Sequence, residues 1–244
     1  HLHDPDCDSF DPPPELSGRG ELGRTTIVTD EAGDTALALD FALSMRSGRT
    51  PPESSGASEA TSIQAEASKL RLLGLLHYLW DSAELTKWRP SWGGKRSWFV
   101  VRREILAVAE RTVSKKIPMA SRLYVPAMFS PEKKEELALQ RRKLLHPLLP
   151  VAGKPVPLGI VVGEFKSLDP SQYGRKLTVK HAPDFAFFMS EDLCKKFDAH
   201  MADKVQMVEA IEGTHLIIIA TFSARGSYAE VQEIAVMPVT AQWI

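Results

Sequence analysis

The chain has 244 residues, of which 43% are hydrophobic and 25% are charged, and its 30 basic and 31 acidic side chains give a net charge of -1. This composition excludes a wholly disordered chain, a coiled-coil rod and a collagen-like repeat, and it suffices for a sizeable core. The net charge argues against a nucleic-acid binder, but it is the sum of unequal segments: residues 1–68 carry -9, residues 69–146 carry +10 and residues 147–244 carry -2. Such asymmetry is informative where the total is not.

The first segment is acidic and poor in large apolar residues. Residues 1–43 form an acidic N-terminal segment with helix or strand potential only near residues 35–43. Residues 44–68 are rich in Ser, Thr, Gly, Pro and Ala, and we predict a flexible linker because they cannot bury enough surface to offset their ordering entropy.

Cellular context follows from the cysteines and the hydropathy pattern. Two cysteines are too few for a disulfide framework, which predicts a reducing, cytoplasmic setting. No apolar run approaches the 18 residues of a transmembrane helix, so we expect no membrane contact. The chain begins without methionine and ends directly after an apolar run, so we expect it to be an internal piece of a longer protein.

Residues 69–150 are predicted to form a basic helical domain. Leu70 to Leu85 is apolar on most sides and indicates a buried helix. A second helix should begin at Ser97 and place Trp98 and Ile105 on its apolar stripe. A third helix should begin at the sequence Ser-Pro-Glu of residues 130–132. The helix–turn–helix order also permits a winged-helix-like arrangement.

Residues 151–244 change to the period of strands. The predicted elements are three strands, one amphipathic helix and a closing hairpin: Leu158 to Lys166, Arg175 to Lys180, Phe185 to Met189, Glu191 to Glu212, and Thr214 to Phe222 with Val231 to Val239. Antiparallel strands with one long helix indicate an α+β domain. The predicted fold class is therefore α+β, a basic helical unit followed by an antiparallel sheet.

Several stretches together resemble a known family. These are LHYLWDSAELTKW, GKRSWFVVRREIL, VGEFKSL, YGRKLTVKH and THLIII. The sequence is similar to a proteobacterial family of unknown function encoded on integrative and conjugative elements, a class of mobile genetic element. The resemblance implies further sequence before His1, including a Cys-x-Cys, and more after Ile244. It implies no catalytic residues.

The N-terminus offers a partial metal site. His1, His3 and Cys7 could fill part of a tetrahedral zinc site, because Zn²⁺ favours histidine and cysteine ligands. The upstream Cys-x-Cys that the resemblance implies could complete the site in the full-length protein. The alternative is a terminus whose histidines have no role.

The basic segment is the predicted nucleic-acid-binding region. Its candidate phosphate contacts are Lys87, Arg89, Lys95, Arg96, Arg102, Arg103, Lys115 and Lys116. They surround Trp88, Trp92 and Trp98, and basic side chains with aromatic faces suit phosphates and exposed bases. Against this, Trp98 lies on the apolar stripe, and the acidic residues 1–68 could cover or merely neutralise the basic face. A protein-interaction subunit without nucleic-acid contact is a further interpretation.

A third hypothesis is a metal-dependent nuclease of the PD-(D/E)xK type. Glu164 and Lys166 lie two residues apart in a predicted strand, which puts them on one side of it. The carboxylate would hold Mg²⁺ and the lysine would stabilise charge at the scissile phosphate. The pattern needs an upstream aspartate, whereas Asp184 lies downstream, so a cross-strand pair at a sheet edge is the favoured interpretation. His181, Asp184 and His215 could form a second cluster, and Cys194 is expected to be buried.

Overall fold

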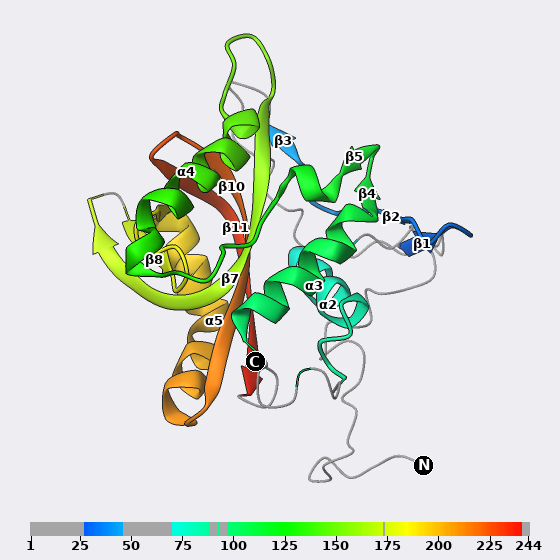
Figure 1. Cartoon of the computed structure of the whole chain (residues 1–244). Coiled ribbons are helices and arrows are strands. Elements are labelled where there is room, and N and C mark those ends of the chain that lie inside the picture. Colours follow the sequence, from blue (N-terminus) through cyan, green and yellow to red (C-terminus); the bar gives the residue numbers. More distant parts are fainter. Residues whose placement is uncertain (1–26, 46–69, 88–91, 93–96, 173, 241–244) are drawn as a thin grey trace, which may run out of the picture.

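The computed structural model describes residues 27–45, 70–87, 92, 97–172 and 174–240 (Figure 1). Five of its strands form a β-barrel. They are β7 (Val156–Ser171), β8 (Gly174–Val179), β9 (Ala186–Ser190), β10 (Thr214–Ala224) and β11 (Tyr228–Thr240). The helix α5 (Glu191–Ala210) connects β9 to β10. Each of these elements overlaps one that the sequence pattern predicts, which confirms the local predictions for this region.

The barrel closes because β7 pairs with two different partners along its length. Its first half, Leu158 to Glu164, pairs with β10, and its second half, Phe165 to Ser171, pairs with β8 after a shift in register. The order around the barrel is therefore β7–β8–β9–β11–β10 and back to β7, with β9 and β11 parallel. This order, with a helix between the third and fourth strands, is the connectivity of the OB-fold, a five-stranded Greek-key barrel.

Close packing at one glycine accompanies the change of partner along β7. A Cβ atom added to Gly163 would overlap Cγ1 of Val179 on β8. Glycine therefore lets the two strands approach where β7 passes from β10 to β8. Two short strands pair with the beginning of β7: β3 (Ser44–Met45) is antiparallel to it and β6 (Leu123–Tyr124) is parallel.

A second, smaller sheet and two helices lie on one side of the barrel (Figure 1). The helices are α2 (Leu72–Ser82) and α3 (Trp98–Glu110). The small sheet has the order β1–β2–β4–β5, from the strands β1 (Ile27–Thr29), β2 (Thr35–Leu37), β4 (Thr112–Ser114) and β5 (Ile117–Pro118). The 3-10 turn η3 (Met119–Ser121) follows β5.

A further helix, α4, lies against another part of the barrel. The turn η4 (Pro131–Lys133) leads into α4 (Lys134–Leu145), which ends in η5 (His146–Leu148). The side chains of Leu145 and Leu148 pack into the barrel core, whereas most of α4 is exposed. The proline at the first turn follows the prediction for this helix start.

Two apolar clusters explain how these elements pack. Alternate residues of β7 and β10, such as Val161 and Ile218, fill the barrel interior. Their neighbours, such as Val162 and Ile219, point outward and share a core with Leu75 of α2. Strands buried on both faces read as continuous apolar runs rather than alternating ones. The helices α2 and α3 therefore use the outer face of the barrel as part of their core.

The predicted fold class is wrong. The described residues form a mostly β structure with a closed five-stranded barrel and few short helices, and not a basic helical unit, winged-helix-like or otherwise, followed by an open antiparallel sheet. The physical reason is that α2 and α3 cannot form a core by themselves and instead cover the outward face of β7, β10 and β11. The parallel contact of β9 with β11 and the bend of β7 complete the barrel, and neither is visible in residue periodicity.

No helix within the described ranges is long and apolar enough to span a bilayer.

Candidate nucleic-acid interface

The predicted basic residues that the structure describes fall on the turn after α2, on α3 and on the hairpin that follows α3. Lys87 is exposed and pairs with Glu84 at 3.2 Å, and Arg103 on α3 is exposed and pairs with Glu104. Arg102 lies one position before Arg103 and is half-buried. Three other predicted contacts, Arg89, Lys95 and Arg96, and the predicted stacking residue Trp88 lie outside the described residues.

The described tryptophans belong to the core. Trp98 is only 3% exposed, its Nε1 donates a hydrogen bond to the Pro126 carbonyl at 2.7 Å, and its ring stacks on His181. Trp92 is buried as well. Neither ring can meet a base, so the interpretation of Trp98 as a core residue is confirmed.

The exposed aromatic side chain of α3 is one that sequence reasoning missed. Phe99 is 57% exposed, next to the buried Trp98. The signal was available, because Phe99 falls off the stripe on which Trp98 and Ile105 lie. On a helix, Arg102 and Arg103 follow Phe99 by three and four positions, so all three occupy neighbouring places on its surface.

Lys115 and Lys116 form the tip of the hairpin between β4 and β5. Ser114 pairs directly with Ile117, so the two lysines are the whole connection. Both have positive φ, 50° for Lys115 and 68° for Lys116, and both are exposed. A two-residue turn with positive φ at both positions is the conformation for which Asn-Gly is the preferred sequence. Two lysines there carry about 1–2 kcal/mol of backbone strain each.

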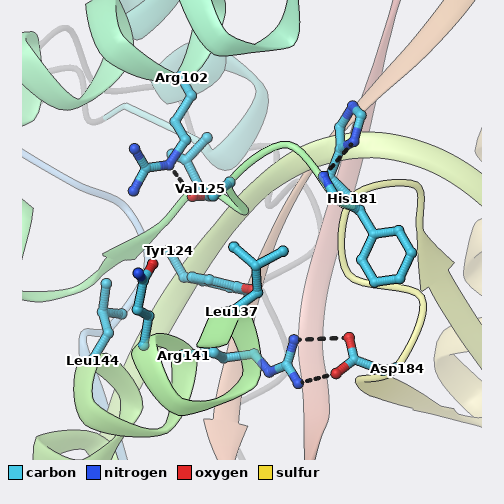
Figure 2. A pocket seen from close by; sticks show the side chains of 11 residues that line it. Arg102, Tyr124, Val125, Leu137, Arg141, Leu144, His181 and Asp184 are labelled. Atoms are coloured by element: carbon cyan, nitrogen blue, oxygen red, sulfur yellow. Dashed lines mark hydrogen bonds and ion pairs between the residues drawn. The ribbon is translucent and has the colours of Figure 1, made fainter. Parts of the chain in front are cut away.

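A small cavity opens between α3, α4 and the β8–β9 connection (Figure 2). Its volume is about 50 Å³, and its polar lining includes Arg102, Tyr124, Arg141, His181 and Asp184. Nε of Arg102 donates to the Val125 carbonyl at 3.0 Å, which fixes the guanidinium at the edge of the cavity. Within the part of the chain that the structure describes, the terminal nitrogens of Arg102 have no partner.

Arg141 and Asp184 form a bidentate ion pair at the floor of this cavity (Figure 2). The two N–O distances are 3.0 and 2.7 Å, and the Arg141 guanidinium also lies 4.8 Å from the centre of the Phe185 ring. Burial acts to raise the pKa of Asp184, but the hydrogen bonds and charge of Arg141 outweigh it, and the pKa lies below its ordinary value. The pair therefore stays ionised and fastens α4 to the barrel.

His181 and Tyr124 are the neutral groups of the cavity. Burial lowers the pKa of His181, although Glu164 opposes the shift. Nδ1 of His181 accepts a long hydrogen bond from the Phe129 N–H at 3.5 Å, which agrees with a neutral ring. Burial also raises the pKa of Tyr124, so its hydroxyl remains protonated. Among the described residues that line the cavity, the positive charge of Arg102 has no acidic partner.

Glu164 is the centre of a second polar cluster, on the barrel. Its side chain is 7% exposed, and its Oε1 accepts from Lys180 and contacts Nδ1 of His215, both at 2.7 Å. His181 lies 3.9 Å from the other carboxylate oxygen. The structure thus brings Glu164 together with two histidines that sequence reasoning had assigned to a separate cluster. A buried carboxylate needs such partners, and this arrangement neutralises it.

The residues of the nuclease hypothesis are not gathered into one group. Lys166 is exposed, Glu164 is paired with Lys180 instead, and Asp184 is bound to Arg141. Among the described residues no cluster of His, Cys, Asp and Glu has the geometry to hold a metal ion. The zinc candidates His1, His3 and Cys7 lie outside the described residues, and Cys194 is buried as expected.

The outer face of β8 and β9 carries mixed charge. Phe188 on β9 is half-buried and packs edge-on against Tyr228. In register beside it are Lys176 on β8 and Glu230 on β11, and Lys176 in turn faces Asp169. Opposite charges along this row leave it without a net attraction for a polyanion.

Comparison with known proteins gives a family and no activity. The model of a family described as "Protein of unknown function (DUF1173)" matches residues 1–244. No curated protein and no solved structure matches the chain.

Proposed function

We propose a function from the residues alone, because the chain belongs to the DUF1173 family, whose description states no activity: the protein binds nucleic acid through α3 and the β4–β5 hairpin. The observation that carries this proposal is the turn formed by Lys115 and Lys116. Strained backbone at exposed positions persists where the side chains serve a purpose other than stability. Two adjacent ammonium groups at a hairpin tip are suited to phosphates.

The distribution of charge supports the same part of the molecule. Residues 69–146 carry +10, whereas residues 147–244 carry -2. Many OB-fold barrels bind oligonucleotides on the face of their second and third strands, but the corresponding strands here, β8 and β9, have a mixed row. The barrel fold therefore supports nucleic-acid binding only by analogy, because function depends on the residues of the site and not on the fold.

Replacing the turn tests the proposal, because stability and binding should change in opposite directions. In Lys115→Asn/Lys116→Gly we expect a free energy of unfolding about 1–2 kcal/mol higher, from relieved strain less the entropy that glycine adds to the unfolded chain. If both lysines contact phosphate, affinity for a fluorescent single-stranded oligonucleotide should fall about 25-fold at 0.1 M salt. Each lost phosphate contact lowers the affinity about fivefold at 0.1 M salt, since the logarithm of the affinity changes by about 0.7 per contact for each tenfold change in salt, and two contacts multiply to about 25-fold.

Two control proteins separate contact from general charge. Lys115→Arg/Lys116→Arg keeps the charges and should bind within about twofold of the natural protein. Lys195→Gln/Lys196→Gln removes two exposed lysines from α5 and should also leave affinity nearly unchanged. Absence of binding by the natural protein at 50 mM salt would refute the proposal. An equal loss in the α5 variant would show that only total charge matters.

The wider context is part of the proposal and is supported by the sequence resemblance alone. We propose a cytoplasmic accessory protein of a bacterial mobile genetic element, of the integrative and conjugative type. A zinc ion held partly by His1, His3 and Cys7 in the full-length protein belongs to the same proposal. Metal analysis of the full-length protein with a Cys7→Ser control tests it, and absence of zinc in both proteins would end it.

The other two functional hypotheses predict different results in the same assays. A nuclease would cleave the oligonucleotide in the presence of Mg²⁺ or Mn²⁺ and lose this activity in Glu164→Ala. A protein-interaction subunit would neither bind nor cleave the oligonucleotide. The contacts of the described residues favour neither of these over binding.

A further inference from the structure

We propose that the first half of α3 and the neighbouring cavity form a subsite for one unpaired nucleotide, in which Phe99 stacks on the base and Arg102 holds a phosphate. This inference rests on the proposed nucleic-acid binding and adds a preference for single strands. The residues of this subsite differ from Lys115 and Lys116 of the β4–β5 turn, so the two sites can be tested separately. The supporting observations are the exposure of Phe99, the terminal nitrogens of Arg102, which have no partner among the described residues, and the charge of the cavity beside Arg102.

The arginine is held in place while its terminal nitrogens remain available. Figure 2 shows the hydrogen bond from Nε of Arg102 to the Val125 carbonyl, which orients the guanidinium. Its terminal nitrogens have no partner within the described ranges, and the side chain lines the cavity. A planar guanidinium that is held through Nε and offers both terminal nitrogens is the group that binds phosphate oxygens in bidentate fashion.

The charge of the cavity matches a phosphodiester. Arg141 and Asp184 cancel each other, and His181 and Tyr124 are neutral because they are buried. Of the described residues that line the cavity, Arg102 therefore contributes one positive charge that no acidic side chain pairs, and a phosphodiester carries one negative charge. The cavity of about 50 Å³ has room for a few water molecules or a small anion. A base must consequently stay outside it.

Phe99 is placed to receive that base. It is 57% exposed and lies one helical turn before Arg102, where side chains are about 5–6 Å apart at Cβ. An exposed ring alone is ordinary on protein surfaces. Beside an arginine that a hydrogen bond holds in place, it completes the pair of contacts that single-stranded nucleic acid uses, which are aromatic stacking and backbone neutralisation. Bases in a duplex already stack on each other and cannot use the ring.

Three probes distinguish the two contacts: a fluorescent oligothymidylate of twelve nucleotides, an abasic strand of the same length and a duplex. We expect Phe99→Leu, measured by fluorescence anisotropy at 50 mM salt, to weaken oligothymidylate binding about five- to tenfold and to leave the abasic strand and the duplex unchanged. Phe99→Tyr keeps the ring and should restore affinity. Leu139→Ala, at an exposed apolar residue of α4, is the control and should have no effect.

Arg102→Gln should weaken binding of the oligothymidylate and the abasic strand alike, by about fivefold at 0.1 M salt, and reduce the salt slope by about 0.7. Arg103→Gln, at the neighbouring residue that is paired with Glu104, should weaken binding of both strands less than Arg102→Gln does. The subsite is overturned if Phe99→Leu weakens all probes equally or none, or if Arg102→Gln has no effect. If those variants are silent while the lysine-turn variant still loses affinity, only the subsite fails. If the natural protein binds no probe, the proposed function and the subsite fail together.

Discussion

Arg141 and Asp184 give the sharpest stability prediction, because their ion pair is a buried polar link between α4 and the barrel. The side chains are 8% and 17% exposed, and both N–O contacts are short. Most of the remaining surface of α4 is exposed, so few apolar contacts can replace the pair. We expect its loss to weaken the docking of the helix.

The magnitude follows from burial. Removing one partner of a buried ion pair costs about 3–5 kcal/mol, since the other charge is left without compensation. In Arg141→Met the Asp184 carboxylate is near enough to the surface to recover some hydration, so we expect a loss near 3 kcal/mol. Asp184→Asn leaves a neutral acceptor for the guanidinium and should cost about 2 kcal/mol. In the double variant the losses should not add, and the coupling energy should be about 2 kcal/mol.

Urea unfolding at pH 7 of the natural protein, the two single variants and the double variant measures this coupling energy. A matched cycle uses Arg175 and Asp198, which have the same bidentate geometry, 2.6 and 2.7 Å, but are 36% and 48% exposed. That exposed pair should couple by less than about 1 kcal/mol. Equal coupling energies in the two cycles would refute the reasoning from burial.

The remaining predictions concern acidity, close packing and the Glu164 cluster. The pKa of Asp184 is lowered in the folded protein, so its stabilising contribution is complete at neutral pH and disappears as pH falls through that pKa. In Asp184→Asn the free energy of unfolding should therefore depend less on pH in the acid range. The pKa of His181 is lowered in the folded protein, so below the ordinary pKa of 6.5 the unfolded chain binds a proton that the folded chain does not, and the free energy of unfolding decreases as pH is lowered. His181→Phe can keep the stack on Trp98 and should reduce this decrease, measured by thermal unfolding between pH 7.5 and 5.5. Gly163→Ala should lower the free energy of unfolding in urea by about 1–3 kcal/mol, because the added Cβ overlaps Val179. Adding Val179→Ala should restore part of this stability, and no restoration would show that the overlap is not the cause. Glu164→Gln should cost about 1–3 kcal/mol because Lys180 and His215 lose a charged acceptor, and an unchanged urea midpoint would contradict this account.

In the candidate site, residue type alone predicted some of the candidate residues but not their arrangement. The pattern identified Lys115, Lys116 and Arg102 as basic candidates, but the positive φ values of the turn and the cavity beside Arg102 depend on how strands and helices meet. Phe99 was readable from its place off the apolar stripe. The meeting of Glu164 with His215 required the pairing of β7 with β10, which joins residues 51 positions apart.

The order of the helices α2 to α5 and of the barrel strands along the chain was determined by the sequence itself, because turn residues and apolar periodicity act locally; the short strands β1, β3, β4, β5 and β6 were not predicted. The helix α5 and the strands β7 to β11 fall where those signals predict them. Closure of the barrel was decided only in three dimensions. Strands that are apolar on both faces carry no information about their partners, so the bend of β7, the parallel contact of β9 with β11 and the cover supplied by α2 depend on packing between distant residues. The net charge of -1 is likewise a sum, in which residues 69–146 carry +10 and residues 147–244, which include the barrel, carry -2.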